Sequence, residues 1–308
     1  MTELLAEEAA IQERPPLGSA RLTGGPVALA VLITIFWGTN PTALKLALRG
    51  FPPIGAAGLR FAIAALGVWL WCLAMRVPVR PQRGEMPWLL AVGAFFIVQI
   101  ATFTLGVYWG TATHSIVILH TYPFFVVALA HFLIPGDRAS PGRVIGLVAA
   151  FSGIIALFLG ELGRWRGTQL LADVTQLASA FVLAAQIVFI KHTVARIDPN
   201  RVVLWQMVLG APVFLGYSFV FEGLAQARPD LVSTASVMYQ GMIIGAFCFT
   251  IWTRLIRHHA ASRVAIFGFI GPVVGVLLGA FALHEPISPT LIASTILVAL
   301  GIITANLF

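Results

Sequence analysis

Long apolar runs separated by short polar gaps follow one another from residue 26 to the end of the chain. Each run has roughly the 17 to 25 residues that a helix needs to cross the hydrocarbon core of a bilayer. The pattern therefore predicts an all-α integral membrane protein with ten transmembrane helices. The expected helices are 26–48, 54–75, 87–109, 113–134, 142–160, 168–190, 201–221, 235–256, 262–283 and 289–307.

The first run contains a polar interruption, Trp37-Gly38-Thr39-Asn40-Pro41. Pro41 has no backbone N–H, so the carbonyl of Trp37 loses its helical partner. At membrane depth such a carbonyl is tolerated only if it is buried in protein or lines a polar cavity. The stretch is thus either a packing kink or part of the wall of a cavity near the bilayer midplane, and we favour cavity lining for Trp37 and Asn40.

The composition supports the membrane assignment, because 59% of the residues are apolar and only 10% are charged, against about 25% in soluble domains. The net charge of +7 is not a nucleic-acid signal, since the basic residues lie in the gaps between apolar runs rather than in a patch. Cys72 and Cys248 both lie inside apolar runs and are expected to be inert small hydrophobes.

The distribution of Lys and Arg predicts the orientation. If the N-terminus is cytoplasmic, 13 basic residues fall on the cytoplasmic side and 5 on the other, with Arg60 inside the second run. Both termini should therefore be cytoplasmic. Residues 1–25 carry four glutamates and no apolar core, so we interpret them as a disordered cytosolic tail rather than a secretory signal.

The two halves of the chain show a weak internal repeat. Pro123 corresponds to Pro272 at an offset of 149 residues, and Gly153-Ile154-Ile155 corresponds to Gly301-Ile302-Ile303 at 148. The sequence thus predicts two five-helix repeats, 26–160 and 168–308. An odd number of helices makes the repeats inverted, and substrate sites of such carriers lie near the midplane where the repeats meet.

Several short motifs resemble the drug/metabolite transporter superfamily, specifically its EamA-type ten-helix permeases. The motifs are Trp37 to Pro41, Arg60-Phe61, Thr121-Tyr122-Pro123 and His284-Glu285-Pro286. The resemblance implies a helical basket around a central cavity, with export from the cytoplasm. The nearest functional type is the bacterial aromatic amino acid exporter of the YddG kind. The first half has Gly136-Asp137-Arg138 where the second has His284-Glu285-Pro286, which leaves the substrate open.

Polar and aromatic side chains inside the runs are the candidate substrate-binding residues, because intramembrane polar groups are costly. His120 and Phe269 each precede a proline of the repeat by three residues. Each candidate could instead have a purely structural role. Amides often join neighbouring helices, aromatic rings often pack against other side chains, and Trp252 could belong to an interfacial aromatic belt. The candidates are Trp37, Asn40, Gln99, His120, Tyr122, Gln176, Gln186, Tyr239, Phe249, Trp252 and Phe269. The expected hinge residues are Gly38, Pro41, Pro123 and Pro272.

Other intramembrane residues are expected to be structural. The Arg60 side chain should reach towards a helix end, although contact with substrate is an open alternative. Asp173 is expected to be paired. Gly271, Gly275 and Gly279 recur every fourth residue, which predicts a surface for close helix packing.

The same residues exclude several function classes. His114 and His120 are six apart and face different ways, so no metal site is predicted. The chain has no His-Glu-x-x-His helix, which disfavours an intramembrane enzyme. It has no ATP-binding loop, which predicts secondary or facilitated transport, and no cofactor is expected. No Asp or Glu lies in 26–48, which disfavours the proton-coupled export of cations known from small multidrug transporters.

The sequence therefore predicts a secondary transporter in the bacterial inner membrane that exports small metabolites, with aromatic and other neutral amino acids as the first expectation. An exporter of cationic drugs or other metabolites is the alternative, and an intramembrane enzyme is a remote one. The expected partners are a small-molecule substrate and membrane lipid, not nucleic acid, and the sequence says nothing of the oligomeric state.

Overall fold

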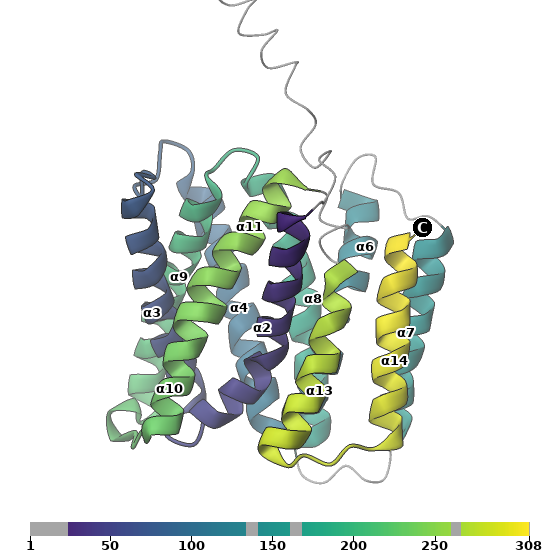
Figure 1. The fold of residues 1–308 in the computed structure, drawn as a ribbon. Helices are drawn as coiled ribbons and strands as arrows, with labels where there is room; N and C mark the ends of the chain where they lie inside the picture. Colours follow the sequence, from purple (N-terminus) through teal and green to yellow (C-terminus); the bar gives the residue numbers. More distant parts are fainter. Residues whose placement is uncertain (1–23, 134–140, 161–167, 260–265, 308) are drawn as a thin grey trace, which may run out of the picture.

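Helices make up almost all of the computed structural model, which describes residues 24–133, 141–160, 168–259 and 266–307 (Figure 1). The first half comprises α2 (Gly25–Ala47), α3 (Pro53–Ala74), α4 (Met86–Trp109), α5 (Ala112–Leu119), α6 (Tyr122–Leu133) and α7 (Pro141–Gly160). The second half comprises α8 (Gln169–Thr193), α9 (Pro199–Tyr217), η1 (Ser218–Glu222), η2 (Leu224–Gln226), α10 (Leu231–Tyr239), η3 (Gln240–Cys248), α11 (Phe249–His258), η4 (Ile266–Phe269), α13 (Ile270–Leu283) and α14 (Pro289–Leu307).

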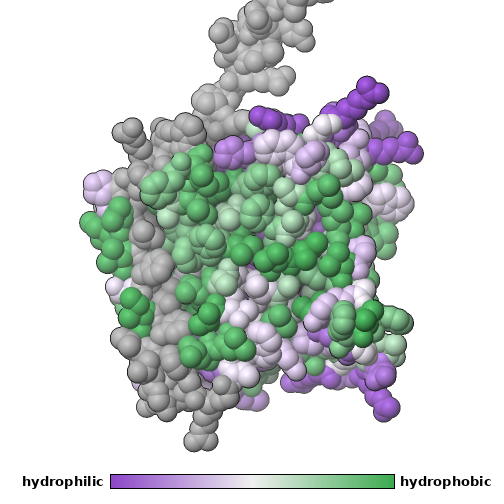
Figure 2. Space-filling view, turned by 180° about the vertical axis from the view of Figure 1, so that it is seen from behind, coloured by the Kyte–Doolittle hydropathy of each residue, from purple (hydrophilic) through white to green (hydrophobic). Residues whose placement is uncertain are grey.

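These helical segments coincide with the predicted apolar runs to within a few residues at each end, wherever the structure describes them. Within the described residues, seven helical segments are long and apolar enough to cross a membrane, and α13 and part of α14 are shorter apolar helices. Figure 2 shows a hydrophobic band around the middle of the molecule, with hydrophilic side chains gathered towards its two ends. Large apolar side chains such as Phe281 and Phe221 lie 76% and 72% exposed, which suits contact with lipid tails. The predicted tail lies almost wholly outside the described residues.

Prolines and capping residues mark the N-termini of several helices. Proline lies in the first turn of α2, α3, α4 and α9, where its missing N–H has no helical partner anyway. Asp230 and Ser233 form a capping box at α10, and the side-chain and backbone hydrogen bonds from Ser233 hold the pKa of the Asp230 carboxyl below its ordinary value.

Two helix starts are capped from elsewhere in the chain. The Glu222 carboxylate accepts hydrogen bonds from the backbone N–H groups of Ile54 and Gly55 at the start of α3. The Glu285 carboxylate accepts them from Ala112 and Thr113 at the start of α5. Carboxylates satisfy the free amides and complement the positive end of a helix. These bonds give the His284-Glu285-Pro286 motif a structural role.

Gly271, Gly275 and Gly279, which recur every fourth residue, let α13 approach α2 and α5 closely. A Cβ atom on Gly271 would lie within 2.8 Å of the His120 imidazole carbon Cε1, and one on Gly275 within 2.9 Å of the Gly38 carbonyl oxygen. A Cβ on Gly279 would lie 2.6 Å from a Thr113 methyl group. The prediction of a close-packing surface is confirmed, with α2, beside α13 in Figure 1, and α5 as its partners.

Replacing Gly38 by alanine should destabilise the protein by about 1–3 kcal/mol, because the added methyl would overpack this crossing. Its Cβ would lie 2.8 Å from the Gly271 carbonyl oxygen and 3.0 Å from the Val274 Cβ. Thermal unfolding of the purified variant in detergent measures the loss. Gly216→Ala is the matched control, since nothing lies within 4 Å of a Cβ there. Equal melting temperatures for the two variants would show that α2 and α13 are not in tight contact.

Candidate functional site

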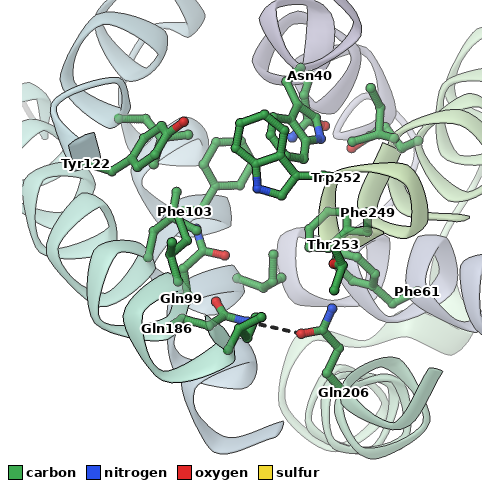
Figure 3. Close-up of a pocket in the computed structure, with 18 of the residues that line it drawn as sticks. Asn40, Phe61, Gln99, Phe103, Tyr122, Gln186, Gln206, Phe249, Trp252 and Thr253 are labelled. Atoms are coloured by element: carbon green, nitrogen blue, oxygen red, sulfur yellow. Dashed lines mark hydrogen bonds between the residues drawn. The ribbon is translucent and has the colours of Figure 1, made fainter. Parts of the chain in front are cut away.

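A central cavity lies where α2, α3, α4, α8, α9 and the α10–η3–α11 segment face one another, beside the break between α5 and α6 (Figure 3). Residues three and four apart on a helix share a face, which is how each helix contributes its lining. The polar and aromatic lining residues are Trp37, Asn40, Arg60, Phe61, Gln99, Phe103, His120, Tyr122, Gln186, Gln206, Gln240, Phe249, Trp252 and Thr253. The apolar remainder is Ile100, Leu119, Leu183, Ile187, Ile190, Ile244 and Ile256.

One wall of the cavity is aromatic. The Trp37 ring centroid lies 4.8 Å from that of Trp252 and 5.9 Å from that of Phe249, both in edge-on geometry. Phe249 in turn meets Phe61 edge-on at 6.2 Å. Such contacts hold the rings in place, and the rings give the cavity an aromatic wall.

Amide side chains form the opposite side. Gln186 on α8 donates through Nε2 to Oε1 of Gln206 on α9 at 3.1 Å (Figure 3). The side-chain amide of Gln99 on α4 donates to the Ser179 hydroxyl at 3.1 Å, and that hydroxyl donates to the backbone carbonyl of Gln99. The amides therefore both line the cavity and join neighbouring helices.

Among the described lining residues Arg60 is the one side chain with a permanent positive charge, and it is 2% exposed. Its Nη1 donates to Oε1 of Gln240 at 2.8 Å and more weakly to Oδ1 of Asn40 at 3.4 Å. Its guanidinium carbon lies 4.6 Å from the Phe61 ring centroid and 5.8 Å from that of Phe103. Cation–π contact thus replaces part of the lost hydration.

His120 ends α5 at the break in the fourth segment. Its Nδ1 lies 2.8 Å from the Ile116 carbonyl oxygen, which can only accept, so Nδ1 carries the proton. Nε2 of the neutral ring is then an acceptor, and it lies against the bare Cα of Gly271. Glycine at position 271 is what leaves room for the imidazole.

Among the described residues, no aspartate or glutamate belongs to the lining. In the part of the chain that the structure describes, no group of three or more His, Cys, Asp or Glu side chains could hold a metal ion. The cavity offers aromatic surface, amides and one guanidinium, a set suited to binding a small molecule with an apolar body and a few polar groups.

The EamA-like transporter family model matches the chain twice, over residues 25–159 and 170–307. The chain belongs to the EamA-like transporter family. It is therefore a drug/metabolite-type permease and a multi-pass membrane protein rather than an enzyme.

Curated proteins similar to this EamA-like transporter are named as transporters or efflux pumps. A "Probable amino-acid metabolite efflux pump" of Escherichia coli is 25% identical over 89% of this chain and 92% of its own length. An uncharacterised transporter of Archaeoglobus fulgidus is 27% identical over 90% and 96%. A solved crystal structure superposes with a TM-score of 0.71 at 20% identity, covering 92% of this chain and 98% of its own, and so shares the fold.

The structure of this EamA-like transporter brings most of the predicted site residues to one cavity. Eight of the eleven candidates line it, and they come from α2, α4, the α5–α6 break, α8 and α11. They are Trp37, Asn40, Gln99, His120, Tyr122, Gln186, Phe249 and Trp252. Trp252 is 7% exposed, so it belongs to this wall and not to an interfacial belt.

Two candidates do not line the cavity. Gln176 is fully buried against the backbone of Gly106, where α4 and α8 cross, because the glycine leaves a hollow that the amide fills. The Tyr239 hydroxyl lies 2.6 Å from the Thr39 hydroxyl, and it joins α10 to α2 instead of facing the cavity. The side chain of Phe269 lies outside what the structure describes.

The prediction for Arg60 was wrong. Its guanidinium does not reach a helix end but lies in the cavity wall, because Gln240, Asn40 and two phenylalanine rings hold it there. Gln206 was missed altogether. The sequence could have indicated Gln206, since it is an amide inside an apolar run, as Gln186 is.

The predicted hinges differ in their geometry. Pro41 lies inside a continuous α2, so it does not break that helix. Pro123 lies in the first turn of α6, directly after the break at His120, and Pro272 lies in the first turn of α13 after the 3-10 turn of η4. Gly38 provides the crossing of α2 with α13. Asp173, expected to be paired, lies 3.3 Å from the His114 ring nitrogen Nδ1.

Proposed function

We propose that this protein exports small neutral amino acids, aromatic ones foremost, from the cytoplasm across a bacterial inner membrane. The observation that carries the proposal is the central cavity, with its aromatic wall, its amides and its lining without carboxylates. An aromatic side chain suits the surface of Trp37, Trp252 and Phe249, and amides can donate to and accept from a zwitterion. The name of the Escherichia coli relative is consistent with such a substrate.

Transport would proceed by alternating access between two inverted five-helix repeats, 26–160 and 168–308, with both termini cytoplasmic. The two matches of the family model, over 25–159 and 170–307, support this division. The close glycine crossing of α13 with α2 and α5 would seal one end of the cavity in this conformation. Gly38, Pro41, Pro123 and Pro272 would act as the points about which the helices move.

An exporter of cationic drugs is the competing function. Aromatic walls bind organic cations as well, so this part of the cavity does not decide between the two. The guanidinium of Arg60 favours amino acids over cationic drugs, because a buried cation repels a second cation and no described carboxylate in the lining offsets it.

Purified protein in proteoliposomes loaded with labelled phenylalanine, tryptophan, threonine or a quaternary ammonium dye tests the proposal. We expect efflux of the aromatic amino acids well above that from empty liposomes, less efflux of threonine, and none of the dye. Dye efflux without amino acid efflux would support the competing function. Efflux of none of the four would refute the proposal.

A further inference from the structure

Arg60 carries a buried charge that the protein does not neutralise. Within the described residues no carboxylate forms an ion pair with it, although it is 2% exposed. Burying an ionised group without an opposite charge is costly, even with hydrogen bonds and cation–π contacts. By contrast, the buried Arg201 lies beside Glu85. A bound anion would supply the counter-charge that the described residues do not provide.

The amides beside Arg60 accept hydrogen bonds from it through their oxygens and keep their N–H donors unused. A guanidinium can only donate, so Gln240 and Asn40 must turn their carbonyl oxygens towards it. This orientation leaves their NH₂ groups free. The Nε2 of Gln240 and the Nε of Arg60 are buried and have no hydrogen-bond partner within the described residues. Unused N–H donors around a cation suit a ligand that only accepts, and a carboxylate is such a ligand.

A second recess that borders the cavity at Ile256 is also lined by basic side chains. A recess at the end of the molecule where α8 and α11 finish shares Ile256 with the central cavity. Its basic lining residues are Lys191, His192, Arg196 and Arg257. Asp198 lies 3.8 Å from Arg257 and is not among the described residues that line the recess. A recess of one sign raises the local concentration of oppositely charged solutes.

We propose that Arg60, with Gln240 and Asn40, forms a carboxylate-binding subsite, so that the substrate class is small carboxylates with an apolar or aromatic body. The inference rests on the proposed function only in taking the central cavity as the substrate site. The carboxylate lies at the guanidinium, and the body of the substrate lies against Trp37, Trp252 and Phe249. Because the described lining residues include no carboxylate, an α-ammonium group contributes less to binding than the carboxylate does.

A series of ligands tests this subsite on the unmodified protein. Calorimetric titration of the purified transporter in detergent compares phenylalanine, 3-phenylpropionate, phenylalanine amide and 2-phenylethylamine. We expect the two carboxylates to bind at least about tenfold more tightly than the amide and the amine, as expected from losing charge-assisted hydrogen bonds. Equal or tighter binding of the amide or the amine, or no binding of either carboxylate, overturns the subsite.

Two variants refine the test. Arg60→Gln should abolish the preference for carboxylates. Arg60→Lys should retain part of it, because lysine keeps the positive charge but lacks the paired N–H donors of a guanidinium. Arg254→Gln is the control, since Arg254 also bonds an amide, Oδ1 of Asn200 at 3.0 Å, but does not line the cavity. An unchanged carboxylate preference in a folded Arg60→Gln variant refutes the assignment.

Transport separates this inference from the proposed function. Proteoliposomes that export phenylalanine and phenylalanine amide equally well keep the proposed function and overturn the subsite. Proteoliposomes that export 3-phenylpropionate but no amino acid overturn the proposed function and support the subsite.

Discussion

Arg201→Met should destabilise the protein by about 3–5 kcal/mol, because it leaves a buried carboxylate without its partner. Nη1 of Arg201 lies 2.6 and 2.5 Å from the two Glu85 oxygens, and Nε donates to the Pro78 carbonyl at 3.0 Å. The Arg201 side chain is 4% exposed and that of Glu85 is 11% exposed. These bonds hold the connection between α3 and α4 against the start of α9. Thermal or denaturant unfolding in detergent measures the loss.

The controls separate burial from mere charge removal. Arg257→Met should cost under about 1 kcal/mol, since Arg257 and Asp198 are 40% and 31% exposed and their closest atoms are 3.8 Å apart. The double replacement Glu85→Met with Arg201→Met should recover much of the stability, because neither charge remains. If Arg201→Met costs no more than Arg257→Met, the buried pair does not stabilise the fold.

Trp37→Leu should raise the KM for tryptophan export about tenfold while threonine export changes little. The variant removes the ring that joins Trp252 and Phe249 into one wall, and aromatic contacts are worth about 0.5–1.5 kcal/mol beyond the area they bury. Efflux from proteoliposomes at several internal substrate concentrations gives KM and the maximal rate separately.

Trp69→Leu is the matched control, because Trp69 on α3 is 41% exposed on the outer surface and does not line the cavity. It should leave KM for both substrates unchanged. A Trp37→Leu variant that raises KM equally for tryptophan and threonine would show a general distortion of the cavity. It would then count against stacking of the substrate on this wall.

Sequence reasoning selected candidate residues by their depth in an apolar run and by their chemical type, and eight of the eleven line the central cavity. Asn40, Gln99, His120 and Gln186 were found because polar groups inside apolar runs are costly and so have a reason to be there. The same criterion selected Gln176, which fills a hollow at Gly106 instead. Depth in a run and chemical type do not reveal which side of a helix faces the cavity.

Arg60 shows the limit most clearly. A lone arginine two turns inside a run usually extends its flexible side chain towards water. Its actual position depends on Gln240, which is 180 residues away in the sequence, and on the ring of Phe103 in α4. No local pattern contains that information.

The sequence by itself indicated a helical membrane protein and the approximate ends of its helices, because hydrophobic length and helix-starting prolines are local properties. The motifs also indicated the family. Only the tertiary structure decided which faces meet at the cavity and which meet lipid. Lipid tails are as apolar as a protein core, so an outward-facing leucine and an inward-facing one look the same in the sequence. The packing of α2, α3, α4, α8, α9 and α11 makes that distinction.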